Sequence, residues 1–211
     1  MDKILEIYDK RLWTCNKNCE QDQFNVSLLL VGLDVHDVCC DIERMKELAE
    51  YLTVEDTWHI ELVLDLMIVY IFARLNMAQN VQIMEDSMRK FVHDFSKSEQ
   101  FLTLWLTASK AIQMYVAGKY AESCGSFEKV VDHAIQFGGS QEQRDIIQDI
   151  YIAALSKSDQ KKHWEQARQI LLKRLDERRV PMRLRQLAVV EEKLGNTPSA
   201  TALKTEAEKS C

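Results

Sequence analysis

A spacing of small, glycine and aromatic residues recurs in the second half of the chain. Its clearest copy runs through Ala111, Gly118, Tyr120, Ser123 and Phe127. The glycine predicts the end of a helix, because a residue without a Cβ adopts the left-handed backbone conformation at least cost. Small residues at Ala111 and Ser123 allow two helix backbones to approach closely. The spacing therefore predicts two antiparallel helices joined by a tight turn.

The same spacing returns twice in weaker form. The later copies share the small positions of both helices, which are Ala154 and Ala167 in one copy and Ala188 and Ala200 in the other. Ala167 lies 44 residues after Ser123, and Ala200 lies 33 residues after Ala167. This order and period resemble the tetratricopeptide repeat, a helix-turn-helix unit of about 34 residues. The resemblance implies an all-α, right-handed solenoid of stacked antiparallel helix pairs.

The resemblance is clearest over residues 100–211, where it implies three units. A further unit upstream is indicated by Val69 and Phe72 on a first helix and by Asn76, Val81 and Met88 at the later positions. We therefore expect one helical-repeat domain over residues 1–211, with a divergent N-terminal part over 1–99. The alternative is an ordinary antiparallel helical bundle, whose apolar period mimics the repeat.

The composition also favours an all-α fold. Only 2 prolines and 6 glycines occur in 211 residues, and Pro181 and Pro198 fall at expected helix starts. No alternating run of Val, Ile or Thr between turn signals predicts a strand. About ten helices are expected, from apolar patterns that cover eleven ranges: residues 1–13, 24–31, 34–52, 54–76, 81–95, 99–117, 121–137, 141–156, 163–178, 182–194 and 198–209.

The sequence contains no signal for a membrane or secreted protein. The helix expected over 54–76 is apolar on nearly all sides and should be buried, but Glu61 and Asp65 leave too short a run to span a bilayer. Residues 1–6 are charged, unlike a secretory leader. The six cysteines lack the spacing of a secreted scaffold or a zinc site. We expect a cytoplasmic or nuclear protein with no metal or other cofactor.

Charge is distributed unevenly along the chain, whose net charge is −6. Residues 1–100 hold 10 basic and 19 acidic residues, whereas residues 101–211 hold 17 and 14. Six basic residues form a candidate basic patch: Lys173, Arg174, Arg178, Arg179, Arg183 and Arg185. Such a patch binds nucleic acid or an acidic protein segment. A further interpretation is a solvated face, on which the aliphatic parts of the Lys and Arg side chains cover apolar surface. Glu177 within the cluster and the acidic chain favour the last two interpretations over nucleic acid.

An enzymatic alternative rests on the order of four residues. His59, His93, Asp94 and Asp132 follow the order of metal ligands in the all-helical HD-type phosphohydrolases, which they resemble in that respect alone. Convergence of these side chains on a metal would be required. Phe91 and Phe95 should share the buried side of their helix, because they lie four residues apart. This leaves His93 and Asp94 on the exposed side.

The remaining polar residues have structural interpretations. His36 and His163 stand near helix starts and are expected to be capping or surface residues. Glu191 and Glu192 are expected on a solvated helix face, not as an acid-base pair. No phosphate-binding glycine loop or nucleophile elbow occurs. We expect no catalytic residue and no small-molecule substrate.

The resemblance also implies a partner-binding groove, because the first helix of each tetratricopeptide unit lines a concave surface. The matching residues are Trp105, Ser109, Ile112, Tyr115, Val116, Ile152, Met182, Arg185 and Val189. Ala108, Ile112 and Ile152 replace the Lys and Asn with which the chaperone-binding subset holds a terminal carboxylate. An apolar groove with aromatic anchors suits an extended or helical segment of a protein partner. The sequence therefore predicts a scaffold or adaptor, with the alternative that Trp105 and Tyr115 are core residues.

Overall fold

The computed structural model describes residues 62–94, 98–138 and 141–209, and it has no strand within them. The α-helices are α4 (Leu62–Arg74), α5 (Ala78–Asp94), α6 (Glu99–Val116), α7 (Tyr120–Phe127), α8 (Gln141–Lys157), α9 (Lys161–Glu177), α10 (Pro181–Lys193) and α11 (Thr197–Lys209), with a 3-10 helix η2 (Val131–Phe137). The all-α class is thereby confirmed for these residues. The helices expected over 1–13, 24–31 and 34–52 lie outside the described part.

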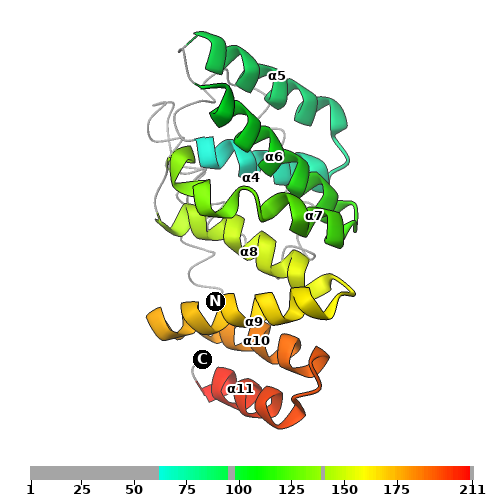
Figure 1. The fold of residues 1–211 in the computed structure, drawn as a ribbon, viewed down its shortest axis with the longest axis vertical. Coiled ribbons are helices and arrows are strands. Elements are labelled where there is room, and N and C mark those ends of the chain that lie inside the picture. The colour runs from blue at the N-terminus through cyan, green and yellow to red at the C-terminus, as the bar shows by residue number, and fades with distance from the viewer. Residues whose placement is uncertain (1–61, 95–97, 139–140, 210–211) are drawn as a thin grey trace, which may run out of the picture.

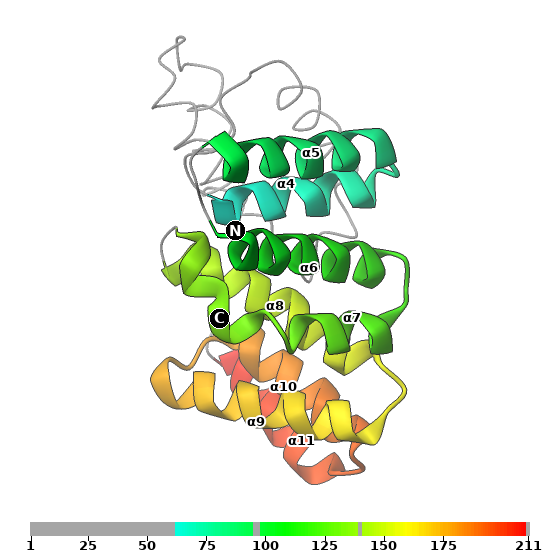
Figure 2. The same cartoon turned by 45° about the horizontal axis from the view of Figure 1, so that its top comes forward.

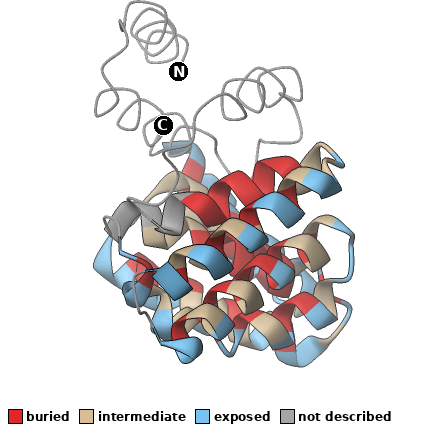
Figure 3. Cartoon of the chain, turned by 90° about the horizontal axis from the view of Figure 1, so that it is seen from above, coloured by how far each residue is buried: buried red, intermediate tan, exposed pale blue. Residues whose placement is uncertain are grey.

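Consecutive helices pack as antiparallel pairs that follow one another along the long axis of the molecule (Figures 1 and 2). The pairs are α4 with α5, α6 with α7, α8 with α9, and α10 with α11. The second helix of each pair packs against the first helix of the next. Buried residues follow the sides on which helices face one another, and they form one continuous core (Figure 3).

Tight turns join the helices of each pair. Gly118 and Gly195 close α6 and α10 with φ of 76° and 84°, as the glycine positions predict. Asn76 has a φ of 57° at the equivalent turn after α4. The turn after α8 uses a different device, in which the Ser158 hydroxyl accepts a hydrogen bond from the backbone N–H of Gln160 at 3.2 Å.

The small residues of the repeated spacing are all buried. Ala111, Ser123, Ala154, Ala167, Ala188 and Ala200 are each at most 1% exposed. A short side chain at such positions lets the two helices of a pair pack with little separation. The prediction that these positions lie between helices is confirmed for the pair α6 and α7 by the contact between Ala111 and Ser123.

Helix α4 is buried on several sides, as its apolar sequence predicts. Every residue from Leu66 to Phe72 is at most 8% exposed, and α4 packs on α5, α6, α8 and η2. None of the described helices has the length and apolarity needed to cross a membrane.

The single helix expected over residues 121–137 is divided in the structure. Helix α7 ends at Phe127, and the chain continues from Val131 as the 3-10 helix η2. Val130 leaves the helical region with φ −120° and ψ −35°. Two consecutive β-branched valines lower helix propensity at this point. The division also allows Phe137 to pack edge-on against Phe101, with ring centroids 5.9 Å apart.

Candidate partner-binding surface

The groove residues expected on α6 and α8 are core residues in this structure. Trp105, Ser109, Ile112 and Ile152 are wholly buried, and Tyr115 is only 6% exposed. A side chain without accessible surface does not contact a partner. These five positions therefore do not form an exposed groove wall, which corrects the expectation from the sequence and agrees with its core alternative for Trp105 and Tyr115.

The preceding helix pair covers this face of α6. The ring of Tyr70 on α4 lies 6.4 Å from the ring of Tyr115. On α5, the Glu85 carboxylate accepts hydrogen bonds from Ser109 Oγ at 2.8 Å and from Gln113 Nε2 at 3.0 Å. The chain's own helices α4 and α5 thus occupy the surface that the resemblance assigns to a partner.

The remaining groove candidates keep accessible surface. Val116 and Met182 are half-buried, Arg185 is exposed, and Val189 is 45% exposed. Arg185, Val189 and the exposed Lys193 stand four residues apart on α10, a spacing that places them along one side of the helix. We call these three residues the α10 stripe.

Lys193 is held in place by uncharged groups. Its Nζ donates a hydrogen bond to the carbonyl oxygen of Ser156 at 2.5 Å and lies 5.4 Å from the ring centroid of Trp164. A carbonyl and an aromatic face attract a cation without neutralising it. These two contacts hold the ammonium at the C-terminal end of the α10 stripe.

Lys157 makes the same kind of contact one helix pair earlier. Its Nζ donates to the Tyr115 hydroxyl at 3.0 Å and lies 5.0 Å and 5.8 Å from the rings of Tyr115 and Tyr120. Sequence reasoning missed both lysines. The available signal was their position in the last turn of a first helix, 36 residues apart, which is close to the repeat period.

A pocket of about 360 Å³ lies between the turns that follow α6 and α8. It is lined by Gly118, Lys119, Tyr120, Ala121, Glu122, Lys157, Ser158 and Asp159. Two lysines and two carboxylates give this lining no net charge. The pocket offers polar contacts without a preference for one class of ligand.

Two members of the predicted basic patch belong to an ionic cluster that joins α8, α9 and α10. Arg174 is 4% exposed and pairs with Asp149 and, at 2.7 Å, with Asp145. Arg183 is 3.1 Å from Asp145 and donates a hydrogen bond to the carbonyl oxygen of Arg174. Burial raises the pKa of Asp149 to about 6, although Arg174 and Arg183 act in the opposite direction. Arg174 and Arg183 are thus structural ion-pair partners, which corrects their assignment to a surface patch.

The other four members do not form one continuous patch either. Arg179 binds Glu206 of α11 through two hydrogen bonds of 2.7 Å and 2.8 Å. Lys173 and Arg178 are exposed at the C-terminal end of α9, whereas Arg185 belongs to the α10 stripe. The six basic residues therefore serve different contacts.

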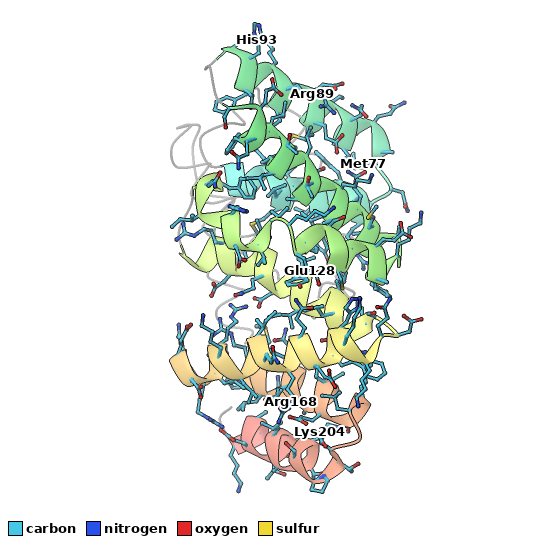
Figure 4. The ribbon with its side chains drawn as sticks, viewed as in Figure 1. Met77, Arg89, His93, Glu128, Arg168 and Lys204 are labelled. Carbon is cyan, nitrogen blue, oxygen red and sulfur yellow. The ribbon has the colours of Figure 1, made fainter. Side chains whose placement is uncertain are left out.

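Glu191 is buried, which corrects the expectation of a solvated face. It is 2% exposed, and its carboxylate accepts hydrogen bonds from Arg168 Nε at 2.7 Å and from Asn196 Nδ2 at 2.5 Å. Arg168 lies between α9 and α10 (Figure 4). Pairing with a cation offsets the cost of removing a carboxylate from water. Its neighbour Glu192 is exposed, and it pairs with Lys204 at 2.5 Å.

His163 stands in the first turn of α9 and is buried. Its Nδ1 lies 2.6 Å from Ser158 Oγ, and the neighbouring Trp164 donates from Nε1 to the carbonyl oxygen of Ser158 at 2.7 Å. Ser158 Oγ also accepts a hydrogen bond from the backbone N–H of Gln160 at 3.2 Å, so this hydroxyl joins His163 to the turn before α9. Burial lowers the pKa of His163. The expected position near a helix start is confirmed, but the side chain is not on the surface.

The residues of the HD-type order do not converge within the described part of the chain. His93 and Asp94 are exposed at the outer end of α5 and contact each other at 3.1 Å (Figure 4). Asp132 is exposed on η2, and His59 lies outside the described residues. Among residues 62–94, 98–138 and 141–209, no three His, Cys, Asp or Glu side chains are placed to hold a metal ion.

No protein-family model, curated protein or solved structure matches the chain. Function is therefore inferred from the residues and their geometry.

Proposed function

We propose that this chain is a non-catalytic protein-protein interaction module, acting as a scaffold or adaptor subunit of a protein complex in the cytoplasm or nucleus. The observation that carries this proposal is the α10 stripe, where the apolar Val189 is 45% exposed between two exposed basic side chains. An apolar contact framed by charged groups is the usual anatomy of a protein interface. A segment of a protein partner is the proposed ligand.

The helix pairs support a tetratricopeptide-like architecture for this module. Left-handed residues occur at equivalent turns in Asn76, Gly118 and Gly195, and the small positions of the pairs α6–α7, α8–α9 and α10–α11 are buried. Repeat architectures of this kind present extended surfaces to partners, because each unit contacts only its neighbours. The stripe lies on the first helix of the last pair, which is the helix type that lines the groove in that family.

Val189→Asp tests the proposal. The affinity-tagged variant should lose proteins that co-purify with the wild type, because a carboxylate would replace the apolar contact. Its melting temperature should stay close to that of the wild type, since Val189 is already half exposed. Leu172→Asp is the matched control, because Leu172 is a 38% exposed apolar residue of α9 outside the stripe. Retention of every partner by Val189→Asp would contradict this assignment.

A further inference from the structure

We infer that Lys157 and Lys193 hold successive helix pairs at a fixed relative angle. Each lysine is the C-terminal residue of the first helix of its pair, Lys157 in α8 and Lys193 in α10. Each side chain reaches back to the preceding pair, where it contacts the end of the first helix and the start of the second. The two lysines form a conformational device of the fold, which is independent of the proposed function.

The contacts of Lys157 join α8 to both helices of the pair α6–α7. Tyr115 lies in the last turn of α6, and Tyr120 is the first residue of α7. The Lys157 ammonium donates a hydrogen bond to the Tyr115 hydroxyl at 3.0 Å and lies 5.0 Å and 5.8 Å from the centroids of the two rings. Lys157 therefore bridges the turn that joins α6 to α7.

Lys193 makes equivalent contacts one pair later. Ser156 lies in the last turn of α8, and Trp164 lies in the first turn of α9. The Lys193 ammonium donates a hydrogen bond to the Ser156 carbonyl oxygen at 2.5 Å and lies 5.4 Å from the centroid of the Trp164 ring. The turns after α6, α8 and α10 lie on the same edge of the stack (Figures 1 and 2), so both lysines act along this edge.

The position of these contacts gives them control over the angle between pairs. Helix α7 packs on α8, and α9 packs on α10, so the second helix of one pair forms the main interface with the next. Two pairs that meet along one helix can rotate about it, and such rotations set the curvature of a repeat stack. The lysines instead connect the first helices of successive pairs, α8 to α6 and α10 to α8. A contact at this place opposes the rotation.

The chemistry of the contacts predicts an effect on the angle rather than on folding. A cation over an aromatic ring at an accessible site contributes little to the free energy of unfolding. Lys157 and Lys193 are both exposed, and the core of each pair does not depend on them. Variants at these positions should therefore fold and still differ in the arrangement of the pairs.

Distances between spin labels test the inference on the full chain. The labels are attached to p-acetylphenylalanine introduced at the exposed positions of Lys110 in α6, Gln169 in α9 and Thr201 in α11. The distance from 110 to 169 crosses the interface with the Lys157 contact, and the distance from 169 to 201 crosses the interface with the Lys193 contact. Pulsed electron paramagnetic resonance gives the distribution of each distance.

Each lysine should affect only its own interface. Lys157→Met removes the ammonium, and it should shift or broaden the 110–169 distribution by about 2 Å or more, the scale of small helix shifts at interfaces. The 169–201 distribution should stay unchanged. Lys193→Met should have the reverse effect, so each variant is the control for the other.

The charge itself is controlled separately. Lys162→Met removes one positive charge from the exposed start of α9 and should leave both distributions unchanged. K157R/K193R keeps a cation and a donor at both positions and should retain the distributions of the wild type. Unchanged distributions in Lys157→Met and Lys193→Met, or an equal change in Lys162→Met, would overturn the inference.

Acetylation of the unmodified chain tests the contacts without any substitution. With a limiting amount of acetic anhydride, Lys157 and Lys193 should react about two- to fivefold more slowly than the exposed Lys162 and Lys173, because the amine must first leave its ring and acceptor. Mass spectrometry of peptides gives the four rates. Equal rates would show that the contacts are not formed in solution and would overturn the inference even if a variant fails to fold. Neither measurement uses a protein partner, so both results are distinguishable from the outcome of Val189→Asp.

Discussion

The Ser123 hydroxyl on α7 donates a hydrogen bond to the carbonyl oxygen of Ala111 on α6 at 2.8 Å. Both residues are wholly buried. A side chain as short as serine reaches the backbone of a neighbouring helix only when the two helices pack very closely. This contact therefore fixes the separation within the pair, and it explains why both positions carry small residues.

Ala111→Leu should destabilise the protein by about 1–3 kcal/mol, because the extra methyl groups overpack a close helix contact. Urea unfolding monitored by circular dichroism measures the change. Ala202→Leu, on the exposed side of α11, provides the matched control and should alter stability by about 0.5 kcal/mol or less. Equal stabilities of the two variants would argue against the close contact.

The helix pairs could be predicted because their signals are local. Gly118 and Gly195 mark turns through their own backbone conformation, and the small residues mark helix contacts through their own size. The division of the helix after Phe127 was missed, because the apolar pattern continues through the following residues. The break falls at two consecutive valines, and after it Phe137 packs on Phe101 of another helix, a contact that the local pattern does not contain.

The candidate site was harder to predict because its exposure depends on distant residues. Arg174 stands among basic residues in the sequence, but its acidic partners come from the preceding helix α8. The sequence pattern around Glu191 is typical of a solvated helix face. In the fold, however, Arg168 of α9 donates a hydrogen bond to its carboxylate. Helices α4 and α5 cover the groove positions on α6. The local sequence pattern does not predict which surface a neighbouring helix covers.

Trp105→Ala should cost about 3–5 kcal/mol of stability, because a wholly buried aromatic side chain is removed from the core. Tyr115→Ala should also be strongly destabilising, since it additionally removes the acceptor of Lys157. Val189→Ala is the surface control and should change stability by about 0.5 kcal/mol or less. Thermal and urea unfolding of the three variants test this contrast. A Trp105→Ala protein as stable as the wild type would mean that Trp105 is not a core residue.

Arg174→Met should destabilise the protein by about 3–5 kcal/mol, because it leaves the Asp149 carboxylate buried without its closest guanidinium. Replacing both partners in R174M/D149L should recover part of this loss, since no unpaired charge remains at that position. Lys173→Met is the neighbouring exposed control. Equilibrium unfolding in urea gives all four stabilities. A double variant less stable than Arg174→Met would contradict the buried-pair explanation.

The buried His163 should make the free energy of unfolding depend on pH. Its pKa in the folded protein is below the ordinary 6.5, with burial as the main cause. Below pH 6.5, His163 therefore binds a proton more readily in the unfolded chain than in the folded protein. The contribution of the neutral His163 to stability is present above pH 6.5 and is lost as the pH falls below it. Asp149 has the opposite sign, because its raised pKa of about 6 favours the folded state as pH falls from 6 toward 3.8. His163→Asn isolates the histidine, since Asp149 is common to both proteins.

The measurement is the difference in unfolding free energy between pH 7.5 and pH 5.5 for the wild type and for His163→Asn. The wild type should lose more stability, or gain less, than the variant over this interval. Identical differences would mean that His163 binds its proton equally well in the folded and unfolded states. His133→Asn, at an exposed position of η2, is the matched substitution outside the core.

Deletion of residues 198–211 should cause aggregation, because α11 packs along α10 as the last described helix of the stack. Its removal would uncover apolar side chains of the preceding pair, among them Leu187, Val190 and Leu194. It would also remove Glu206 and Lys204, the partners of Arg179 and Glu192. Light scattering and size-exclusion chromatography of the truncated chain measure the effect. The charge variant K204E/E206K, with the helix intact, should stay monodisperse and lose little stability, since both of its ion pairs are exposed. A truncated chain as stable and monodisperse as the full one would show that α11 contributes no packing to the stack.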